Sequence, residues 1–319
     1  MTSDIYRIGG ALGFMVDSAA GVPQLLGAGV DAIILDYLAE GAMGLLGRAR
    51  QADANAGHAP TFMSTHVGPH LERVAAQGTK IVANAGGVNP AGLAAELRAE
   101  LARRGLPLTV GCVSGDDLLA RLPEFVGTPD MDNGRQFPAN GVHSLNAYLG
   151  AFPIAAALDR GADIVITGRV VDSALTLGLL IHRFGWAQGE WDLLAAGTLA
   201  GHLIECSAQA TGGTFTDWDQ VEDWANIGHP IAECRADGSF VLTKPQGTGG
   251  LVSPATVAEQ MLYETTDPQA YIVPDVVLDF SQVTMRQAGP HRVEVAGAIG
   301  HPASSTLKVC ATWDDGWRG

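Results

Sequence analysis

The stretch DIVITGRVVDSAL, residues 163–175, decides the fold class. Its first part is apolar on both faces, which is typical of a strand buried inside a parallel sheet. Arg169 and Asp172 follow this strand, and the residues after them have the spacing of a helix. A buried strand that leads directly into a helix is the repeating unit of an α/β protein.

Similar units recur through the first two thirds of the chain. Short apolar runs predict strands at 6–10, 31–38, 80–86, 108–113 and 163–170. Longer periodic segments predict helices at about 18–28, 40–52, 67–77, 90–104, 116–122, 146–160, 172–184 and 191–208. We therefore expect an α/β fold, a mainly parallel sheet with helices on both faces.

The pattern changes near residue 212, after which antiparallel strands are expected. The predicted elements there are two strands around the Asp237-Gly238 turn, a helix at 254–265 and alternating strands over 271–300. We therefore divide the chain into an α/β domain, 1–211, and a smaller α+β region, 212–319. The last residues, LKVCATWDDGWRG, predict one more strand and a turn with nothing after it, which suggests a truncated C-terminus.

The composition argues against two classes of partner. Asp and Glu number 34 against 19 Lys and Arg, and the formal net charge is −15. Nucleic acid and anionic membrane surfaces would be repelled by this charge. No apolar run reaches the roughly 18 to 20 residues of a membrane span. The four cysteines form no CxxC pair and no secretory signal is visible, so we expect a cytoplasmic protein.

Polar side chains lie where the predicted parallel strands end, the edge at which such sheets bind ligands. Arg169 follows a buried strand and needs a carboxylate or phosphate partner. Asp172 can be that partner in a structural pair. Alternatively, the guanidinium holds a substrate carboxylate in bidentate fashion.

The loop NAGGVNPAGL, residues 84–93, is a candidate anion site. Asn84 ends a predicted strand, and Asn89 with the proline after it matches an N-cap followed by the first helical position. The amides of Gly86 and Gly87 can approach an anion at this helix start. A simple turn with a capped helix is the alternative.

A second loop, KPQGTGGLVSPATVAEQ at 244–260, has the same order of glycines, cap and proline. Part of it is ordinary helix initiation, since Ser253 matches an N-cap. Lys244 adds a positive charge that anion binding needs. We expect this loop to form a cradle for a carboxylate or a CoA phosphate, in the same cleft as Arg169.

His202, Glu205 and Cys206 share one helical face at spacing i, i+3 and i+4. Such residues can bind a metal, pack as a hydrogen-bonded helix face, or carry out general acid–base chemistry. No second ligand pair occurs at a recognisable spacing, so no metal site is predicted. No motif in the chain requires a particular cofactor.

Several long motifs together resemble the acyclic terpene utilisation family, the AtuA-like proteins. They include ANAGGVNP, VSGDDLL, NAYLGAFPIAAALDRGADIVITGRVVDSAL, WDLLAAGTLAGHLIECSAQATGG and KPQGTGGLVSPATVAEQMLYE. The resemblance runs from about residue 6 to the end. It implies a role in catabolism of acyclic terpenes such as citronellol and geraniol, alongside acyl-CoA carboxylation steps, and family members continue beyond the point where this chain stops. No set of catalytic residues comes with it.

The resemblance and the residues together predict an enzyme of lyase or hydratase type. Its ligand would be a small-molecule carboxylate or acyl-CoA. The alternative is a non-catalytic subunit that binds such a ligand or assembles with an acyl-CoA carboxylase, and a nucleotide-dependent enzyme is a third option. A homo-oligomer or a small partner subunit is compatible with either. The candidate catalytic residues are Glu205, His202, Arg169 and Asp172, and the candidate substrate-binding residues are Asn84, Gly86, Gly87, Asn89, Asn146, Lys244, Thr248, Gly249 and Gly250.

Overall fold

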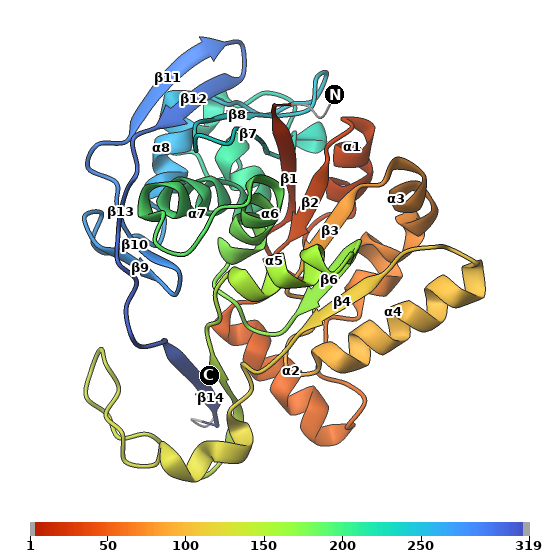
Figure 1. Cartoon of the computed structure of the whole chain (residues 1–319), viewed down its shortest axis with the longest axis vertical. Helices are drawn as coiled ribbons and strands as arrows, with labels where there is room; N and C mark the ends of the chain where they lie inside the picture. Colours follow the sequence, from red (N-terminus) through yellow and green to blue (C-terminus); the bar gives the residue numbers. More distant parts are fainter. Residues whose placement is uncertain (1–3, 315–319) are drawn as a thin grey trace.

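One nine-stranded sheet runs through the computed structural model, which describes residues 4–314 (Figure 1). The strand order is β11-β12-β8-β7-β1-β2-β3-β6-β4. The parallel half contains β1 (Tyr6–Leu12), β2 (Ala32–Leu35), β3 (Lys80–Ala83), β4 (Val110–Val113) and β6 (Ile164–Thr167). The antiparallel half contains β7 (Ile231–Cys234), β8 (Phe240–Thr243), β11 (Thr284–Gly289) and β12 (Arg292–Ala296).

The two halves meet where β1 pairs antiparallel with β7. Strands from 1–211 and strands from 212–319 therefore belong to the same sheet. The expected α/β fold, with a parallel sheet followed by antiparallel strands, is confirmed.

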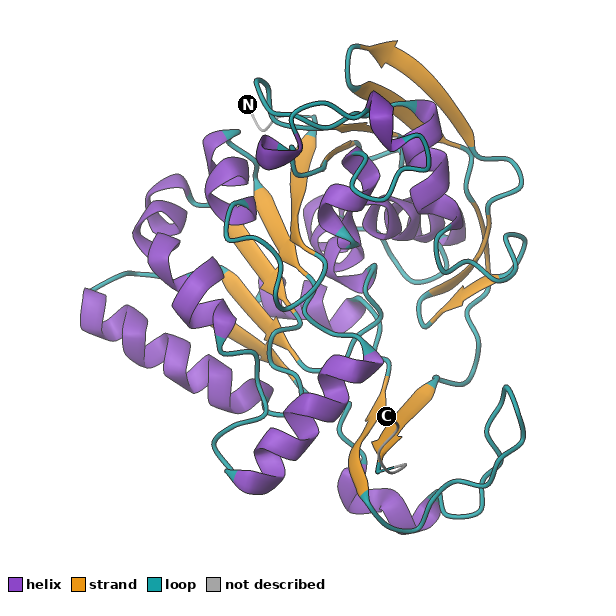
Figure 2. Ribbon diagram, turned by 180° about the vertical axis from the view of Figure 1, so that it is seen from behind, coloured by secondary structure: helices purple, strands orange, loops and turns teal. Residues whose placement is uncertain are grey.

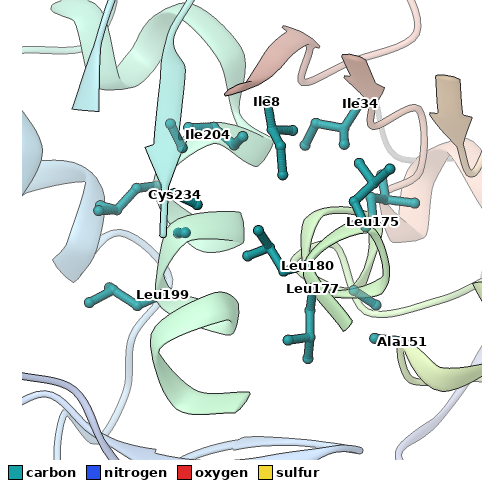
Figure 3. Packing of buried hydrophobic residues seen from close by; sticks show 14 of the residues in the cluster. Ile8, Ile34, Ala151, Leu175, Leu177, Leu180, Leu199, Ile204 and Cys234 are labelled. Carbon is teal, nitrogen blue, oxygen red and sulfur yellow. The ribbon is translucent and has the colours of Figure 1, made fainter. Parts of the chain in front are cut away.

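Helices cover both faces of the parallel strands (Figures 1 and 2). Both faces need a cover because successive side chains of β2 point to opposite faces and are apolar. Ile34 belongs to one apolar cluster and Ile33 to another. The first cluster includes residues of α5 (Phe152–Asp159), α6 (Ala174–Phe184) and α7 (Trp191–Glu205). The second includes residues of α1 (Gly21–Gly27), α2 (Glu40–Ala52), α3 (Leu71–Gln77) and α4 (Pro90–Arg104). Figure 3 shows Ile8 and Ile34 facing α6, with Leu175, Leu177 and Leu180 on that helix.

Smaller elements surround this core. They are α8 (Pro254–Leu262), a sheet of β9 (Tyr271–Val273), β10 (Val276–Asp279) and β13 (Ile299–His301), and the pair β5 (Val142–Ala147) with β14 (Val309–Trp313). Short 3₁₀ helices lie at Gly68–His70, Leu119–Glu124, Ser207–Thr211, Trp218–Gln220 and Trp224–Asn226, and a short π-helix lies at Phe62–His66. The strand expected near the end of the chain is β14, and the turn expected after it lies outside the described residues. No helix within residues 4–314 is long and apolar enough to cross a membrane.

The helix predicted over 146–160 is wrong in its first part. Residues 142–147 form β5, and α5 begins only at Phe152. The strand exists because β14, more than 160 residues later in the chain, pairs with it. Between β5 and α5, the Asp275 carboxylate accepts a hydrogen bond from the Ala151 amide and fills the space beside Gly150. These are tertiary contacts that local periodicity does not report.

Close packing of β1 against α7 leads to the first testable prediction. A Cβ atom added at Gly10 would lie 2.0 Å from the carbonyl oxygen of Ile204. We expect Gly10→Ala to lower the free energy of unfolding by about 1–3 kcal/mol, as overpacking does. Gly41→Ala is the matched control, because its Cβ meets nothing within 4 Å in α2 and should be neutral or slightly stabilising. Urea unfolding of both variants checks this, and equal stabilities would contradict it.

Candidate functional site

The carboxyl ends of β2 and β3 are joined by one buried hydrogen-bonded pair. Asp36 follows β2, and Asn84 follows β3. The Asn84 amide nitrogen donates to Asp36 Oδ1 at 2.6 Å, and its oxygen accepts the Tyr37 amide at 2.7 Å. The predicted contact residue Asn84 therefore holds the carboxylate of Asp36, which is not among the candidate site residues predicted from the sequence.

Arg169 lies at the end of the neighbouring strand β6 and is only 3% exposed. Its Nη1 donates to the Leu38 carbonyl at 2.7 Å and to Asp172 Oδ1 at 2.9 Å. The guanidinium carbon lies 4.2 Å from the centroid of the Tyr148 ring. The structural pair with Asp172 is thus present, while Arg169 Nε has no hydrogen-bond partner among the described residues.

The end of α7 contributes Glu205 and His202. His202 Nδ1 lies 3.0 Å from Glu205 Oε1, and His202 Nε2 donates to the Met261 carbonyl at 3.1 Å. The ring also contacts Tyr271 and Phe280, with centroids 5.3 and 6.3 Å away. Both ring nitrogens are engaged, so His202 has the geometry of a packed residue. Glu205 Oε2 is buried and has no partner within the described chain.

These groups form a carboxylate cluster, by which we mean Asp36, Asp172 and Glu205. Burial raises the pKa of Asp36 well above its usual range, the charge of Asp172 adds to this, and Arg169 opposes it. Burial likewise raises the pKa of Asp172 to about 7, opposed by Arg169 and reinforced by Glu205. The Asp172 side chain is 25% exposed. The cluster therefore contains a carboxyl group that titrates near neutral pH and is reached by solvent.

Asn146 is connected to Arg169 through hydrogen bonds to Asp116. Its Nδ2 donates to Asp116 Oδ2 at 2.7 Å, and this oxygen also accepts the Arg169 amide at 2.8 Å. The missing side chain of Gly168 leaves room for the Asp116 carboxylate. Asn146 and Arg169 line a cavity of only about 10 Å³ beside Tyr148, which is smaller than any substrate.

The β3–α4 loop does not present free amides from its double glycine. The Gly86 amide donates to the Thr167 carbonyl at 3.1 Å, and the Gly87 amide to the Asn84 carbonyl at 3.2 Å. Asn89 Oδ1 caps α4 by accepting the Gly92 amide at 3.0 Å. This is the geometry of the turn and capped helix rather than that of an anion cradle.

The loop that begins at Lys244 follows β8, in the antiparallel half of the sheet. Lys244 Nζ donates to the Thr248 carbonyl at 2.6 Å, and the amides of Gly249 and Gly250 donate at 2.8 Å to the carbonyls of Asn226 and Glu222, respectively. Ser253 forms a capping box at the start of α8.

The expectation that Lys244 and Arg169 face one cleft is not met. Lys244 lines a cavity of about 1030 Å³ with Arg7, His291 and Arg292, whereas Arg169 lines the small cavity beside Tyr148. The sequence placed both residues at strand ends. It did not show that their strands are separated in the sheet by β7, β1, β2 and β3.

A further cavity, of about 390 Å³, lies at the end of β1. Its lining includes Asp17, Gln24, Ser207 and His229, none of which the sequence analysis selected. Gln24 and His229 are 205 residues apart, so no local pattern could have joined them. Within residues 4–314, no three His, Cys, Asp or Glu side chains are placed to hold a metal ion.

Comparison with known proteins agrees with the motifs. The family model described as "Acyclic terpene utilisation family protein AtuA" matches residues 6–319. No curated protein and no solved structure matches the chain. The family match covers nearly the whole sequence, and so the chain belongs to the acyclic terpene utilisation (AtuA) family.

Proposed function

We propose that the protein is a catabolic enzyme of lyase or hydratase type that acts on a carboxylate or acyl-CoA substrate. The observation that supports this most is Asp172, a partly exposed carboxyl group with a pKa near 7 at the carboxyl edge of the parallel strands. Perturbed carboxyl groups of this kind concentrate at catalytic sites. Family membership supplies the catabolic setting.

Addition or elimination of water next to a carbonyl needs one group that takes a proton and one that gives it. A carboxyl group with a pKa near the working pH can do both. Asp172 is our candidate for this proton transfer. Arg169 orients it through the 2.9 Å contact, and the charges of Glu205 and Arg169 act on its pKa in opposite directions.

The Lys244 cavity, although separate from the small cavity beside Arg169, is suited to an anionic group. Its lining has three permanent cations, Arg7, Lys244 and Arg292, against a single carboxylate, Glu233. Glu233 pairs with both arginines, whereas the hydrogen bonds of Lys244 Nζ within residues 4–314 go to the carbonyl and hydroxyl oxygens of Thr248. In a chain of net charge −15, this local excess of positive charge favours a carboxylate or phosphate.

Exchange of substrate protons tests the proposal whatever the product of the reaction is. A panel of small carboxylates and acyl-CoAs in D₂O, followed by proton NMR, reports both α-proton exchange and loss or gain of water. We expect wild-type protein to exchange or convert at least one member, and Asp172→Asn to slow this by about 100-fold or more. Asp132→Asn, at an exposed aspartate, is the matched control and should retain the wild-type rate. An Asp172→Asn variant with the wild-type rate would contradict the role of Asp172.

The alternative is a non-catalytic subunit that binds a ligand or assembles with an acyl-CoA carboxylase. It is supported by the hydrogen bonds that occupy both nitrogens of His202 and by the small cavity beside Arg169. Thermal shift measurements separate the two functions. Stabilisation by a carboxylate or acyl-CoA, with no exchange or conversion of any member of the panel, would favour the binding subunit.

A further inference from the structure

The Lys244 cavity lies on the face of β1 and of the antiparallel strands that points away from α7. Four side chains of these strands belong to the first apolar cluster, with α7: Ile8, Ala232, Leu242 and Val293. Successive side chains of a strand point to opposite faces of a sheet. Neighbours of these four in the sequence therefore lie on the other face, where they line the cavity: Arg7, Glu233, Thr243 and Arg292.

Lys244 is a buried cation without a carboxylate partner. The chain has three lysines, and Lys80 and Lys308 lie 2.8 and 4.0 Å from a carboxylate oxygen. Lys244 is only 8% exposed, and within residues 4–314 its Nζ has hydrogen bonds to the carbonyl and hydroxyl oxygens of Thr248, at 2.6 and 3.5 Å. Burial lowers the pKa of Lys244, and no carboxylate of the described residues opposes this. Because buried charges are stabilised by pairing, an anion in the cavity would provide the counter-charge.

Glu233 does not neutralise the cavity. It lies 3.4 Å from Arg7 Nε and accepts from Arg292 Nη2 at 2.5 Å. Arg7 Nη1 also donates to the carbonyls of Ala28 and Gly29, so that the Arg7 side chain is held in the wall. In the described part of the chain, Arg292 uses only Nη2, and its side chain is 41% exposed. Three permanent cations and one carboxylate leave an excess of two positive charges in the lining.

Further groups of the lining are hydrogen-bond donors. His291 Nδ1 accepts the Val252 amide at 3.3 Å, so the proton of the neutral ring is on Nε2, which can only donate. The amides of Gln246 and Gly247 donate to no protein carbonyl within residues 4–314. An anion accepts hydrogen bonds, and it therefore matches these groups as well as the charge.

Backbone strain lies in the same wall. His291 adopts φ 51° in the turn that joins β11 to β12, directly after Pro290. This is a position at which glycine or asparagine is usual. Strained residues of this kind cluster at ligand sites.

From these features we infer that the Lys244 cavity is a phosphate site, and that its ligand is a phosphate monoester. A carboxylate has one negative charge and two oxygens in a plane. A monoester has nearly two charges at pH 7.5 and three terminal oxygens, which match the excess of positive charge and the donors on several walls. The cavity, about 1030 Å³, also has room for the organic group that carries the phosphate.

The inference rests on the proposed function in one respect, the anionic group assigned to this cavity, and it identifies that group as a phosphate. The tests below measure binding without turnover. Asp172→Asn should therefore bind phosphate monoesters as the wild type does. Proton transfer by Asp172 can fail while the phosphate site stands, and the reverse also holds.

A matched series of small probes tests the inference on the full chain. Phenyl phosphate, benzenesulfonate and benzoate share one ring, but only the first carries a second charge, and only the last is planar. We expect phenyl phosphate to bind at least about tenfold more tightly than either of the others at pH 7.5 and low salt, because the second charge adds to the attraction. Isothermal titration calorimetry measures the ratios. Benzoate or benzenesulfonate binding as tightly as phenyl phosphate overturns the inference, as does absence of phenyl phosphate binding.

Inorganic phosphate separates the two sources of the same group. We expect it to bind at least about fivefold more weakly than phenyl phosphate, since it lacks the apolar surface of the ring. Equal binding would support the phosphate site and overturn the monoester, with free phosphate as the ligand.

Methionine variants locate the binding. Lys244→Met keeps most of the side-chain volume and removes the unpaired charge, so we expect phenyl phosphate to bind at least about 20-fold more weakly. Lys80→Met is the matched control, because Lys80 pairs with Asp163 and does not line this cavity, and its affinity should stay within about twofold of wild type. Wild-type affinity in Lys244→Met overturns the inference.

A second variant keeps the test open if Lys244→Met does not fold. Arg292 has a partly exposed side chain, so Arg292→Met disturbs the core less. It should weaken phenyl phosphate by at least about fivefold and benzoate by less, because the dianion loses more attraction than the monoanion. Unchanged affinity for phenyl phosphate in Arg292→Met overturns the inference.

Discussion

Replacing Arg169 with methionine is expected to lower the free energy of unfolding by about 3–5 kcal/mol at pH 7. The guanidinium is nearly fully buried between Asp172, the Leu38 carbonyl and the Tyr148 ring. Its charge also opposes the raised pKa of Asp36 and of Asp172. Methionine fills much of the volume but leaves the carboxylate cluster without its cation, and an uncompensated buried charge is costly.

Urea unfolding of Arg169→Met measures this loss. Arg103→Met is the matched control, because Arg103 is an exposed arginine whose pair with Glu100 lies on the surface of α4, and such pairs contribute little to stability. The loss in Arg169→Met should also shrink at pH 5, where Asp172 is protonated. Losses of similar size in the two variants would show that Arg169 does not compensate the cluster.

The second large effect is a pH-dependent difference in stability between wild type and Asp172→Asn. In the folded protein Asp172 keeps its proton up to about pH 7, whereas an unfolded aspartate loses it near pH 4. Between these values the unfolded state binds fewer protons, so ionisation of Asp172 destabilises the wild type as pH rises. Asparagine cannot ionise. From pH 5 to pH 7 the variant should therefore gain on the order of 2–3 kcal/mol relative to wild type, with no further gain above pH 8.

The comparison of two proteins is needed because other groups titrate in the same range. Burial lowers the pKa of His229 to about 4, which makes the wild type more stable as pH rises, the opposite direction. This contribution cancels between wild type and Asp172→Asn. Thermal and urea unfolding at four pH values measure the difference. A difference that does not change between pH 5 and 8 would mean that Asp172 has an ordinary pKa in the folded protein.

The parallel half of the fold was predictable because the burial of each strand is visible in the residues of that strand. β2 and β6 are apolar on both faces, and Asn89 and Ser253 cap the helices that the sequence assigned to them. Such signals are local. The pairing of β5 with β14 and of β1 with β7 depends on segments far apart in the chain, and the sequence therefore did not predict either pair.

In the candidate site, too, contacts between residues close in the sequence were predictable and contacts between distant residues were not. The pair of Arg169 with Asp172 was open to prediction because its members are three positions apart in the sequence. The partners of Asn84 and Asn146 were not, since Asp36 is 48 residues from the first and Asp116 is 30 from the second. The two glycine loops show a further limit. Their sequence indicates amides near a helix start, but only the structure shows that Gly86, Gly87, Gly249 and Gly250 already donate to protein carbonyls.

The central claim is that Asp172 is a carboxyl group poised near neutral pH at this edge of the sheet. Carbon-13 NMR of aspartate-labelled protein, with Asp172→Asn used to assign the resonance, measures its titration directly. The structure predicts a midpoint near pH 7 for Asp172. A midpoint at or below about pH 4, the value of an ordinary aspartate, would contradict the claim and remove the main support for proton transfer by this residue.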